Sequence, residues 1–308
     1  MGFALLVASP SATSGRATLV VRGSLNEPFG VAFAANGDLY IVEMGGHRVS
    51  VLDSAGHLRV FAGTGEAGLS GDGGRATQAR FNSPHHLAFG PDGHLYVADT
   101  QNFCVRRIDF ATGVITRIAG TGVEGFAGDG GPAVDAQFSG IFAIAFHGPH
   151  LYVCDLGNRR IRVVDLASGI VTTIAGNGRK GVPVDGQPAI DQPLVDPRAV
   201  AVDASGDVYV LEREGHALRL VTPDGRIRTV AGTGNAGFSG DGGPARAAEL
   251  RGPKHISIDD NDQSVLISDT ENHVHIQLRD NAVNRHRREG HEVLRPPTAV
   301  LLSGVPDK

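Results

Sequence analysis

The feature that most constrains this chain is a glycine-rich segment that recurs at a fixed interval. The segment at 120–133 reads GTGVEGFAGDGGPA; related segments occupy 63–76 and 232–245, and a degraded copy occupies 176–189. Their shared aspartates lie 57, 56 and 56 residues apart, at Asp72, Asp129, Asp185 and Asp241. A repeat of this length predicts an array of similar units, each burying its faces against its neighbours.

Each period contains four short runs with the residue pattern of β-strands. In the second period they span 85–89, 94–99, 103–109 and 114–119, separated by Gly-Pro-Asp-Gly and Asp-x-x-x-Gly turns. Runs joined this way predict a four-stranded antiparallel meander. Forty-three glycines and 16 prolines fit many tight turns, and no useful length of chain shows helical periodicity.

Four-stranded sheets that stack radially form a β-propeller, the fold class that we expect here. A sixth unit starts near the C-terminus after a shortened fifth, and strands within 1–27 are expected to complete it. We therefore expect one all-β domain over 1–308, a six-bladed propeller whose ring is closed by strands from both termini. The pairing of 281–296 is left open. Units begin near Pro28, Pro84, Gly140, Pro197, Pro253 and Pro297.

The unit resembles the NHL repeat, and its glycine-rich loop resembles a common bacterial variety of that repeat. The match runs from Ser24 to about Asp280 and rests on the pattern P-x-x-[VIL]-A-[FV], G-x-[LV]-Y-[VI], N-x-x-[IV] and [VI]-A-G-x-G. The resemblance implies a six-bladed propeller. It implies no single function, because the fold carries lyases, hydrolases and interaction scaffolds.

Composition and motifs exclude several functions. A net charge of -5 and a pI near 6.2 argue against nucleic-acid binding, and no apolar run approaches the roughly 20 residues that span a bilayer. The glycine-rich loops lack the Lys-Ser/Thr and the following helix of a phosphate-binding loop, so no nucleotide cofactor is expected. Two cysteines without a CxxC argue against structural zinc. A cytoplasmic protein is favoured, with secretion or a periplasmic location open if a leader was removed.

Acidic residues repeat at two positions of the unit. The loop aspartates are expected to bond backbone amides of their own turns, as Asx-turns do. The second predicted strand ends in an acid in five units: Glu43, Asp99, Asp155, Glu212 and Asp269. We expect these acids to accept hydrogen bonds from amides of the following loop. Glu43 and Glu212 depart from aspartate and lack the asparagine three residues later, so they are the better functional candidates.

The residue after each unit's first Pro or Gly should face the mouth of the propeller channel, on the face that carries the inter-blade loops. These six positions hold six different residues, so the repeat does not dictate them: Phe29, His85, Ile141, Arg198, Lys254 and Thr298. Two cations and a histidine beside apolar residues predict a small concave site for an anion or a developing oxyanion. His85 is a candidate general base or metal ligand.

The metal question stays open at this stage. Pro-His-His-Leu at 84–87 resembles the zinc-binding Pro-His-x-Leu of an amidating lyase of this family. That enzyme uses the motif in three blades, whereas Arg198 and Lys254 occupy two of the places here, so a three-histidine zinc site is not supported. Related six-bladed hydrolases hold calcium in the channel. Candidate ligands for calcium or another divalent metal are Glu43, His85, Asp155 and Glu212.

Two functions follow, and we prefer the first. One is an enzyme of hydrolase or lyase type acting on a small anionic, ester-like or lactone-like molecule at the channel mouth. His85, Arg198, Lys254 and Glu212 would be catalytic, and Phe29, Ile141, Thr298, Phe126 and Phe238 would bind substrate. The alternative is a non-catalytic scaffold that binds a protein or glycan through the face of the glycine-rich loops. Neither involves nucleic acid or membrane.

Overall fold

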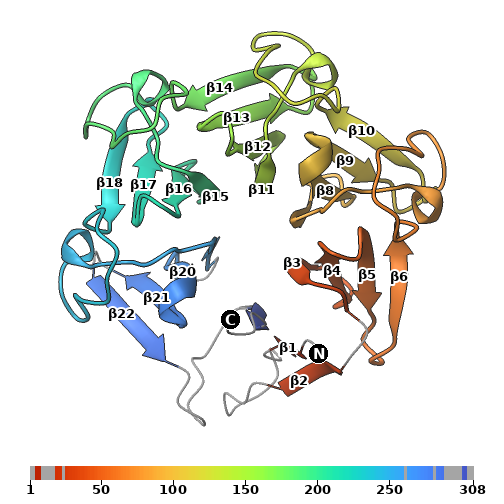
Figure 1. Cartoon of the computed structure of the whole chain (residues 1–308), viewed down its shortest axis with the longest axis horizontal. Helices are drawn as coiled ribbons and strands as arrows, with labels where there is room; N and C mark the ends of the chain where they lie inside the picture. The colour runs from red at the N-terminus through yellow and green to blue at the C-terminus, as the bar shows by residue number, and fades with distance from the viewer. Residues whose placement is uncertain are drawn as a thin grey trace. The chain divides into compact units, whose positions relative to one another are not determined.

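The computed structural model describes residues 4–7, 18–22, 25–259, 262–279, 282–287 and 300–303. It contains five four-stranded antiparallel sheets, each made of strands consecutive along the chain and lying side by side (Figure 1). Blade 1 comprises β3 (Pro28–Phe33), β4 (Leu39–Glu43), β5 (Arg48–Leu52) and β6 (Leu58–Ala62). Blade 2 comprises β7 (His86–Phe89), β8 (Leu95–Asp99), β9 (Cys104–Ile108) and β10 (Ile115–Ala119).

The other three blades repeat this plan. Blade 3 comprises β11 (Ile141–His147), β12 (His150–Asp155), β13 (Arg160–Asp165) and β14 (Val171–Ala175). Blade 4 comprises β15 (Pro197–Val202), β16 (Val208–Glu212), β17 (Ala217–Val221) and β18 (Ile227–Ala231). Blade 5 comprises β19 (His255–Ile258), β20 (Val265–Asp269), β21 (Val274–Arg279) and β22 (Ala282–Arg287). The expected β-propeller blades and their order are therefore confirmed.

The prediction of six blades closed by both termini is wrong. The described residues form five four-stranded blades, and the terminal strands form a separate three-stranded sheet in the order β2-β1-β23. These strands are β1 (Ala4–Val7), β2 (Thr18–Arg22) and β23 (Val300–Ser303). The strands expected near the N-terminus do form. Together with the one C-terminal strand they make a sheet of three strands, where a blade of four was expected.

The fifth unit is not shortened, contrary to expectation. Residues 282–287 form β22, which pairs with β21 in antiparallel register from Val274↔Arg287 to Arg279↔Ala282. The irregular sequence of this stretch hid the strand, because it lacks the alternation of apolar residues that marks strands elsewhere.

The chain divides into two compact units, each described here by itself. Unit 1 contains 1–124, 133–141 and 291–308, and unit 2 contains 125–132 and 142–290. Unit 1 thus holds blades 1 and 2 with the terminal sheet, and unit 2 holds blades 4 and 5 and nearly all of blade 3. One domain over 1–308 stays a prediction.

Burial explains why the second strands of blades 1 and 2 are rich in apolar residues. Every residue of β4 and of β8 is buried, since each strand has paired neighbours on both edges and packed side chains on both faces. The fourth strands are less covered: β6 exposes two of its five residues, Arg59 and Val60. Separate cores run through the two units, with Phe81, Val97 and Ile115 in one and Val210, Leu250 and Ile276 in the other.

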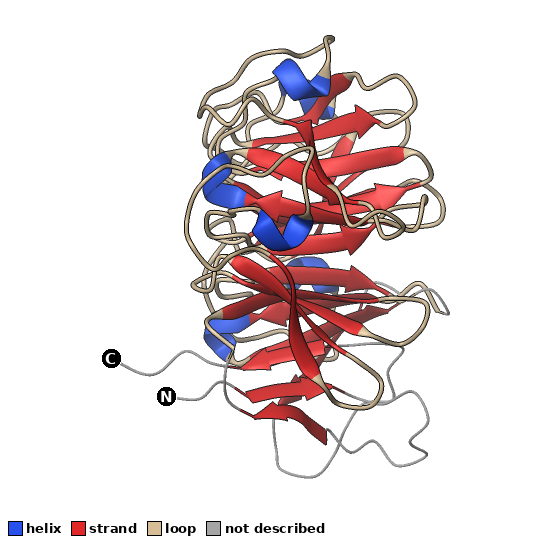
Figure 2. Ribbon diagram, turned by 90° about the vertical axis from the view of Figure 1, so that its right-hand side faces the viewer, coloured by secondary structure: helices blue, strands red, loops and turns tan. Residues whose placement is uncertain are grey.

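In the part of the chain that the structure describes, helix is confined to single 3₁₀ turns (Figure 2). Four of them end the glycine-rich loops and two follow the acid-bearing strands β8 and β20: η1 (Ala76–Gln78), η2 (Thr100–Asn102), η3 (Ala133–Asp135), η4 (Ala189–Asp191), η5 (Ala245–Ala247) and η6 (Thr270–Asn272). Among the described residues, no helix has the length and apolar character to cross a membrane.

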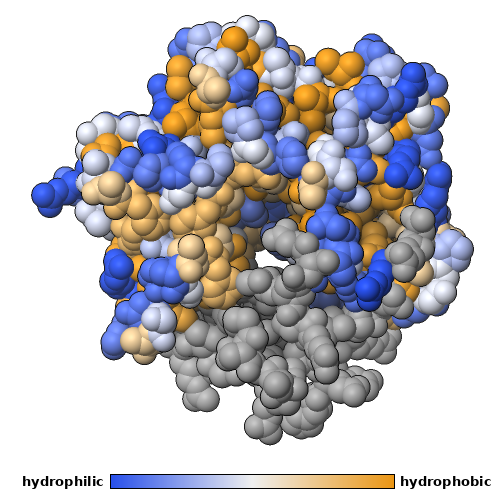
Figure 3. Space-filling model, turned by 180° about the vertical axis from the view of Figure 1, so that it is seen from behind, coloured by the Kyte–Doolittle hydropathy of each residue, from blue (hydrophilic) through white to orange (hydrophobic). Residues whose placement is uncertain are grey.

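Large apolar side chains that reach the surface gather in the glycine-rich loops. Figure 3 shows one face of the molecule, where hydrophobic and hydrophilic residues lie interspersed. Six of the exposed apolar residues belong to these loops: Leu69, Val123, Phe126, Val182, Val184 and Phe238. A scattered apolar surface needs no special account, but a concentration in one repeated loop does.

Candidate functional site

The acids that end the second strands fasten each blade to the loop leading into it. The Asp99 carboxylate accepts hydrogen bonds from the Asn82 backbone amide at 2.7 Å and from the Asn102 side chain at 2.8 Å. The same Asn102 amide also donates to the Gly68 carbonyl at 2.7 Å, in the preceding glycine-rich loop. The acids do accept bonds as expected, but from the asparagine side chain and from the entry loop.

Two fully buried arginines cross-link the loop aspartates to the next blade. Arg106 of β9 donates to Asp72 at 3.0 Å and lies 3.5 Å from Asp99, and Arg162 of β13 donates to Asp129 at 2.7 Å. Asx-turns within the loops were expected instead. The difference arises because the third strand brings a guanidinium beneath the loop, where a carboxylate compensates its buried charge.

Glu43 and Glu212, the candidates chosen for their departure from aspartate, are completely buried in their blades. Glu43 accepts from the Asn26 amide at 2.7 Å and from Arg48 at 2.8 Å. Glu212 accepts from the Val195 amide at 2.6 Å and from Arg219 at 2.8 Å. Each carboxylate thus does for its blade what Asp99 does in blade 2, with an arginine replacing the asparagine.

The missing asparagines follow directly from the longer side chain. A Cβ atom on Gly215 would lie 2.6 Å from Oε2 of Glu212, and one on Gly46 would lie 2.9 Å from Cβ of Glu43. Real Cβ atoms do not approach other atoms so closely, so glutamate and glycine go together at these positions. The repeat explains both departures without a catalytic role.

Burial perturbs these carboxyls. It raises the pKa of Asp99 to about 7, against the opposing effect of its hydrogen bonds and of Arg106. Burial likewise raises the pKa of Glu212, although Arg219 and the Val195 amide pull it down. Strong perturbation marks functional residues and structural networks alike, and complete hydrogen bonding inside the blade favours the structural account here.

Three of the predicted mouth residues lie in unit 1. The Phe29 ring meets the His85 ring edge-on with centroids 4.8 Å apart, so the structure brings these two together. Ile141 is fully buried, and its carbonyl accepts a hydrogen bond from the Thr100 hydroxyl at 2.6 Å. Its side chain therefore belongs to the core of this unit.

The contacts of His85 determine its tautomer. Nδ1 lies 2.9 Å from the Ser83 carbonyl oxygen, and a carbonyl can only accept, so Nδ1 carries a proton. In the neutral ring Nε2 then holds the lone pair. This is the arrangement a general base needs, with one nitrogen held by a backbone oxygen and the other basic.

Two further mouth residues, Arg198 and Lys254, lie in unit 2, where the structure groups cations. Arg198 on β15 is almost completely buried; burial and the neighbouring charge of Arg213 lower its pKa to about 10. Burial also lowers the pKa of Lys254, followed by the charges of Arg198 and Arg213. We call Arg198, Arg213 and Lys254 the cation cluster.

The sequence analysis missed Arg213 and Phe142. Arg213 lies in the turn after β16 and donates to Asp196 at 2.8 Å, while Phe142 stacks against the Arg198 guanidinium at 4.0 Å. A signal for Arg213 was present, since the equivalent positions hold Met44, Thr100, Leu156 and Thr270, none of them charged. Like charges that depress one another's pKa are relieved by an anion, so the cluster can bind a carboxylate or a similar oxyanion.

Other predicted residues stand apart from this cluster. Phe126 and Phe238 occupy equivalent positions in the glycine-rich loops, and both are partly exposed. Phe126 covers the Arg160 guanidinium at 3.7 Å. Asp155 is buried and bound by the Asn158 side chain at 2.9 Å. Thr298 lies outside the described residues.

No metal centre is seen within the described part of the chain: no three His, Cys, Asp or Glu side chains there are grouped so that they could hold an ion. The carboxylate oxygens of the candidates Glu43, Asp155 and Glu212 accept hydrogen bonds from arginine, asparagine and backbone amides. The two cysteines are buried thiols; burial raises the pKa of Cys154 and Cys104 far above the ordinary value, which makes them poor nucleophiles.

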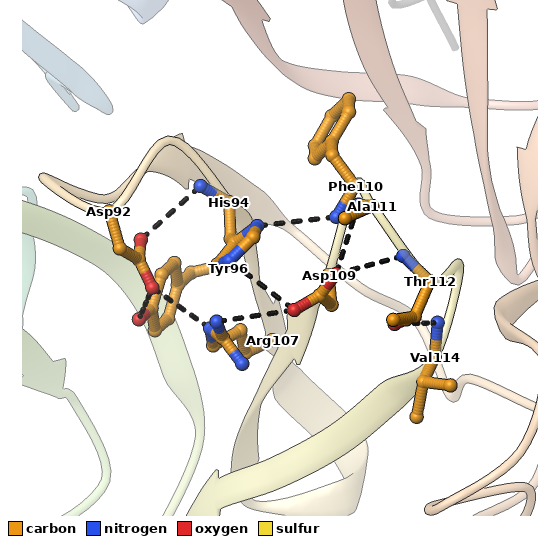
Figure 4. Close-up of polar contacts among 9 residues, drawn as sticks. All are labelled: Asp92, His94, Tyr96, Arg107, Asp109, Phe110, Ala111, Thr112 and Val114. Carbon is orange, nitrogen blue, oxygen red and sulfur yellow. Dashed lines mark hydrogen bonds and ion pairs between the residues drawn. The ribbon is translucent and has the colours of Figure 1, made fainter.

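A second polar cluster lies at the turns of blade 2 (Figure 4). Asp92 accepts from the Tyr96 hydroxyl at 3.0 Å and from Arg107 at 2.9 Å. Burial alone would raise the pKa of Asp92, but these bonds and that from the His94 amide lower it. His94 Nδ1 accepts from the Phe110 amide at 3.2 Å, and Nε2 faces Asp109 at 3.3 Å. The bonds of His94 with Phe110 and Asp109 join the turn before β8 to the turn after β9, so the cluster fastens the end of the blade.

Comparison with known proteins identifies the repeat. The NHL repeat model matches residues 81–108. Protein SUPPRESSOR OF QUENCHING 1 of Arabidopsis thaliana is 29% identical over 266 residues, covering 81% of this chain and 24% of that protein. NHL repeat-containing protein 2 of Bos taurus is 28% identical over 284 residues, covering 82% of this chain and 39% of that protein. The matched repeat and these relatives support the NHL-repeat family for this chain. It spans well under half of these relatives' length.

Solved structures share the fold of this NHL protein. Virginiamycin B lyase of Staphylococcus aureus aligns with a TM-score of 0.54 at 13% identity, over 85% of this chain and 70% of the lyase. A gluconolactonase of Xanthomonas campestris aligns with a TM-score of 0.54 at 16% identity, over 82% of this chain and 71% of the gluconolactonase. An auxiliary nutrient binding protein of Bacteroides ovatus aligns with a TM-score of 0.63 at 20% identity, over 86% of this chain and 60% of that protein. The fold is therefore compatible with enzymes and with binding proteins alike.

Proposed function

We propose that this NHL protein binds a small anionic molecule at the cation cluster and acts on it as a hydrolase or lyase. The observation that carries the proposal is the grouping of Arg198, Arg213 and Lys254. Besides burial, the charge of Arg213 lowers the pKa of Arg198, and the charges of Arg198 and Arg213 lower the pKa of Lys254. Such a grouping costs stability unless it serves a ligand, because like charges repel most strongly where water is scarce.

The cluster suits a carboxylate or a developing oxyanion. Arg198 is held against Phe142, so its planar guanidinium is oriented before a ligand arrives. Arg213 is shared with Asp196 and with Glu214, at 2.8 and 3.3 Å, and an incoming anion would compete for it. In hydrolysis of an ester or lactone, or in elimination beside a carboxylate, these cations would stabilise the negative oxygen that forms.

The reaction class is supported by fold relatives of both kinds, a lyase and a gluconolactonase, at identities that carry the fold alone. The role of His85 as general base stays a prediction. It rests on the tautomer set by the Ser83 carbonyl. A scaffold role for the glycine-rich loops is the alternative, and the exposed Phe126 and Phe238 favour it.

The test is binding and turnover measured with an Arg198→Gln variant. We expect acetate and inorganic phosphate to bind the native protein, and the variant to lose at least tenfold in affinity while its melting temperature changes little. The melting temperature should hold because removing one of three like charges relieves repulsion. Arg179→Gln, at an exposed residue of unit 2 outside the cluster, is the matched control.

Turnover separates the enzyme from a binding protein. Simple γ- and δ-lactones followed by pH-stat should be hydrolysed faster than in buffer, and Arg198→Gln should remove the difference. If the native protein binds neither anion, the proposed function is wrong. If it binds anions but turns over no lactone or ester, the site is a binding site and the hydrolase assignment fails.

A further inference from the structure

The third glycine-rich loop, 176–189, departs from the other three in a way that the blade does not require. At the place of Val184 the other loops have Gly71, Gly128 and Gly240, with φ of 92°, 87° and 96°. A Cβ on Gly71 or Gly240 would lie 2.7 or 2.6 Å from the Cα of Ala79 or Ala248. Valine therefore cannot follow the same path, and Val184 is not among the residues with positive φ.

Two further substitutions move this loop away from its neighbour. Gln192 stands in place of Ala79, and its side-chain oxygen accepts from the Val184 amide at 3.0 Å. Pro193 stands in place of Arg80, whose amide donates to the Ser70 carbonyl at 3.2 Å in the first loop. Proline has no N–H, so that bond cannot form. The third loop takes its own route, and Val182 and Val184 are 64% and 61% exposed.

The altered route leaves open a position that is covered in two other repeats. A Cβ on Gly122 would collide with the Leu69 side chain of the preceding loop. A Cβ on Gly178 would lie 2.5 Å from the Arg160 guanidinium, which Phe126 of the preceding loop covers. At the equivalent Gly234 the nearest atom among the described residues is the Gly215 carbonyl oxygen, 3.9 Å away. Gly65 is similarly open, with the Gly46 carbonyl oxygen at 3.7 Å, but no glycine-rich loop precedes it in the sequence. We call this open position over Gly234 the loop-3 notch, after the preceding loop that leaves it uncovered.

The notch and the cation cluster share one turn of the chain. Gly215 lies two residues after Arg213, in the turn between β16 and β17. On the other side, Lys180 pairs with Glu214 at 3.2 Å, and Glu214 contacts Arg213 at 3.3 Å. A molecule whose charged end reaches Arg213 therefore has uncovered glycine backbone beside it, at Gly215 and Gly234, and the exposed Val182 follows Lys180 by two residues.

We propose that the anion bound at the cation cluster carries an aromatic or branched aliphatic group, and that this group packs in the loop-3 notch. The chemistry follows from what fills the place elsewhere, a leucine in one repeat and a phenylalanine over an arginine in another. The inference rests on the proposed function and narrows its substrate class to amphiphilic anions, such as arylalkanoates and their esters.

The experiment compares two probes that share a carboxylate, acetate and 3-phenylpropionate, by titration of backbone amide NMR signals. We expect 3-phenylpropionate to bind the native protein about tenfold more tightly, from partial burial of one phenyl ring. Binding of 3-phenylpropionate should shift the backbone amide signals of Gly234 and Gly215, whereas acetate should leave these two signals unchanged. Shifts confined to other loops would contradict the notch.

A variant that restores the repeat provides the second arm. Val182→Phe with Val184→Gly, Gln192→Ala and Pro193→Glu gives these four positions the residues of the fourth loop, so the introduced ring should cover Gly234. The tenfold preference should disappear while acetate affinity is unchanged. Ile170→Phe, at an exposed apolar position in the turn before β14, is the matched control and should keep the preference.

The outcomes separate the two proposals. If acetate binds but 3-phenylpropionate binds no better, or if the preference survives in the restored variant, the notch is overturned and the anion site stands. If acetate does not bind the native protein, the proposed function fails and the notch inference with it. Should the restored variant not fold, the amide shifts at Gly234 and Gly215 decide the question in the native protein.

Discussion

Replacing Glu212 and Gly215 together tests whether the glutamate is a structural residue. Glu212→Asp shortens the side chain by one methylene, so the carboxylate cannot keep both the Val195 amide at 2.6 Å and Arg219 at 2.8 Å. Losing one charge-assisted bond inside the blade should cost about 3 kcal/mol. Gly215→Asn places a Cβ 2.6 Å from the Glu212 carboxylate and should cost about 2 kcal/mol through overpacking.

The double variant should cost less than the sum. With both changes, blade 4 acquires the residues of blade 2, where the Asn102 amide donates to Asp99 at 2.8 Å and to the Gly68 carbonyl at 2.7 Å. The introduced asparagine would make the same two bonds, so we expect a total of about 2 kcal/mol and a coupling energy of about 3 kcal/mol. Arg219 would then resemble Arg106, held by a shorter acid.

Urea unfolding of the four proteins measures the coupling, and acetate binding serves as the functional readout. Acetate affinity should be the same in all variants that fold, because Glu212 is fully buried and faces its own blade. Additive costs would refute the packing argument. A Glu212→Asp variant of native stability that has lost turnover would instead make Glu212 a catalytic residue, as the sequence first suggested.

Two further predictions concern buried charge. Arg106→Met should destabilise the protein by about 3–5 kcal/mol in thermal unfolding, since it strips a buried partner from Asp99, whereas Arg107→Met at a part-exposed surface pair should cost about 1 kcal/mol or less; equal costs would refute the bridge. Folding lowers the pKa of Lys254 and of Arg198, so the unfolded state binds more protons than the folded state at high pH. The free energy of unfolding should therefore rise with pH as these groups lose their protons, while acetate affinity falls over the same range. Lys254→Met should weaken both trends. Parallel trends would contradict this sign.

The blades were predictable because the repeat states the same information four times. Strand order and the starts of five blades follow from alternation and turn residues, and the structure places β3, β11 and β15 within a residue of the expected starts. The count of six went wrong for a physical reason. The sequence of a strand does not specify which strand it pairs with, and the terminal strands pair with one another in a three-stranded sheet.

The site was less predictable because one sequence signal has two meanings. Position alone picked out Arg198 and Lys254, which occupy equivalent places in neighbouring blades, and their role in a site stays a prediction. It could not reveal Arg213, which belongs to the cluster through the effect of its charge on the pKa of these cations and not through any motif. Nor could it show that Ile141 turns into the core, since the side chain's environment depends on residues far away in sequence.

A departure from the repeat is informative only when its compensation is known. Glu212 departs from the aspartate of the repeat, and Gly215 departs from its asparagine because the longer glutamate leaves no room for a side chain there. The two departures therefore explain each other. In the third loop, Val184 and Gln192 also compensate each other through a hydrogen bond, yet the result is two exposed valines and an uncovered Gly234. Leaving apolar surface in water is unfavourable in the free protein. That unbalanced cost beside the cation cluster, rather than the unusual residues themselves, is the reason to look there for a ligand.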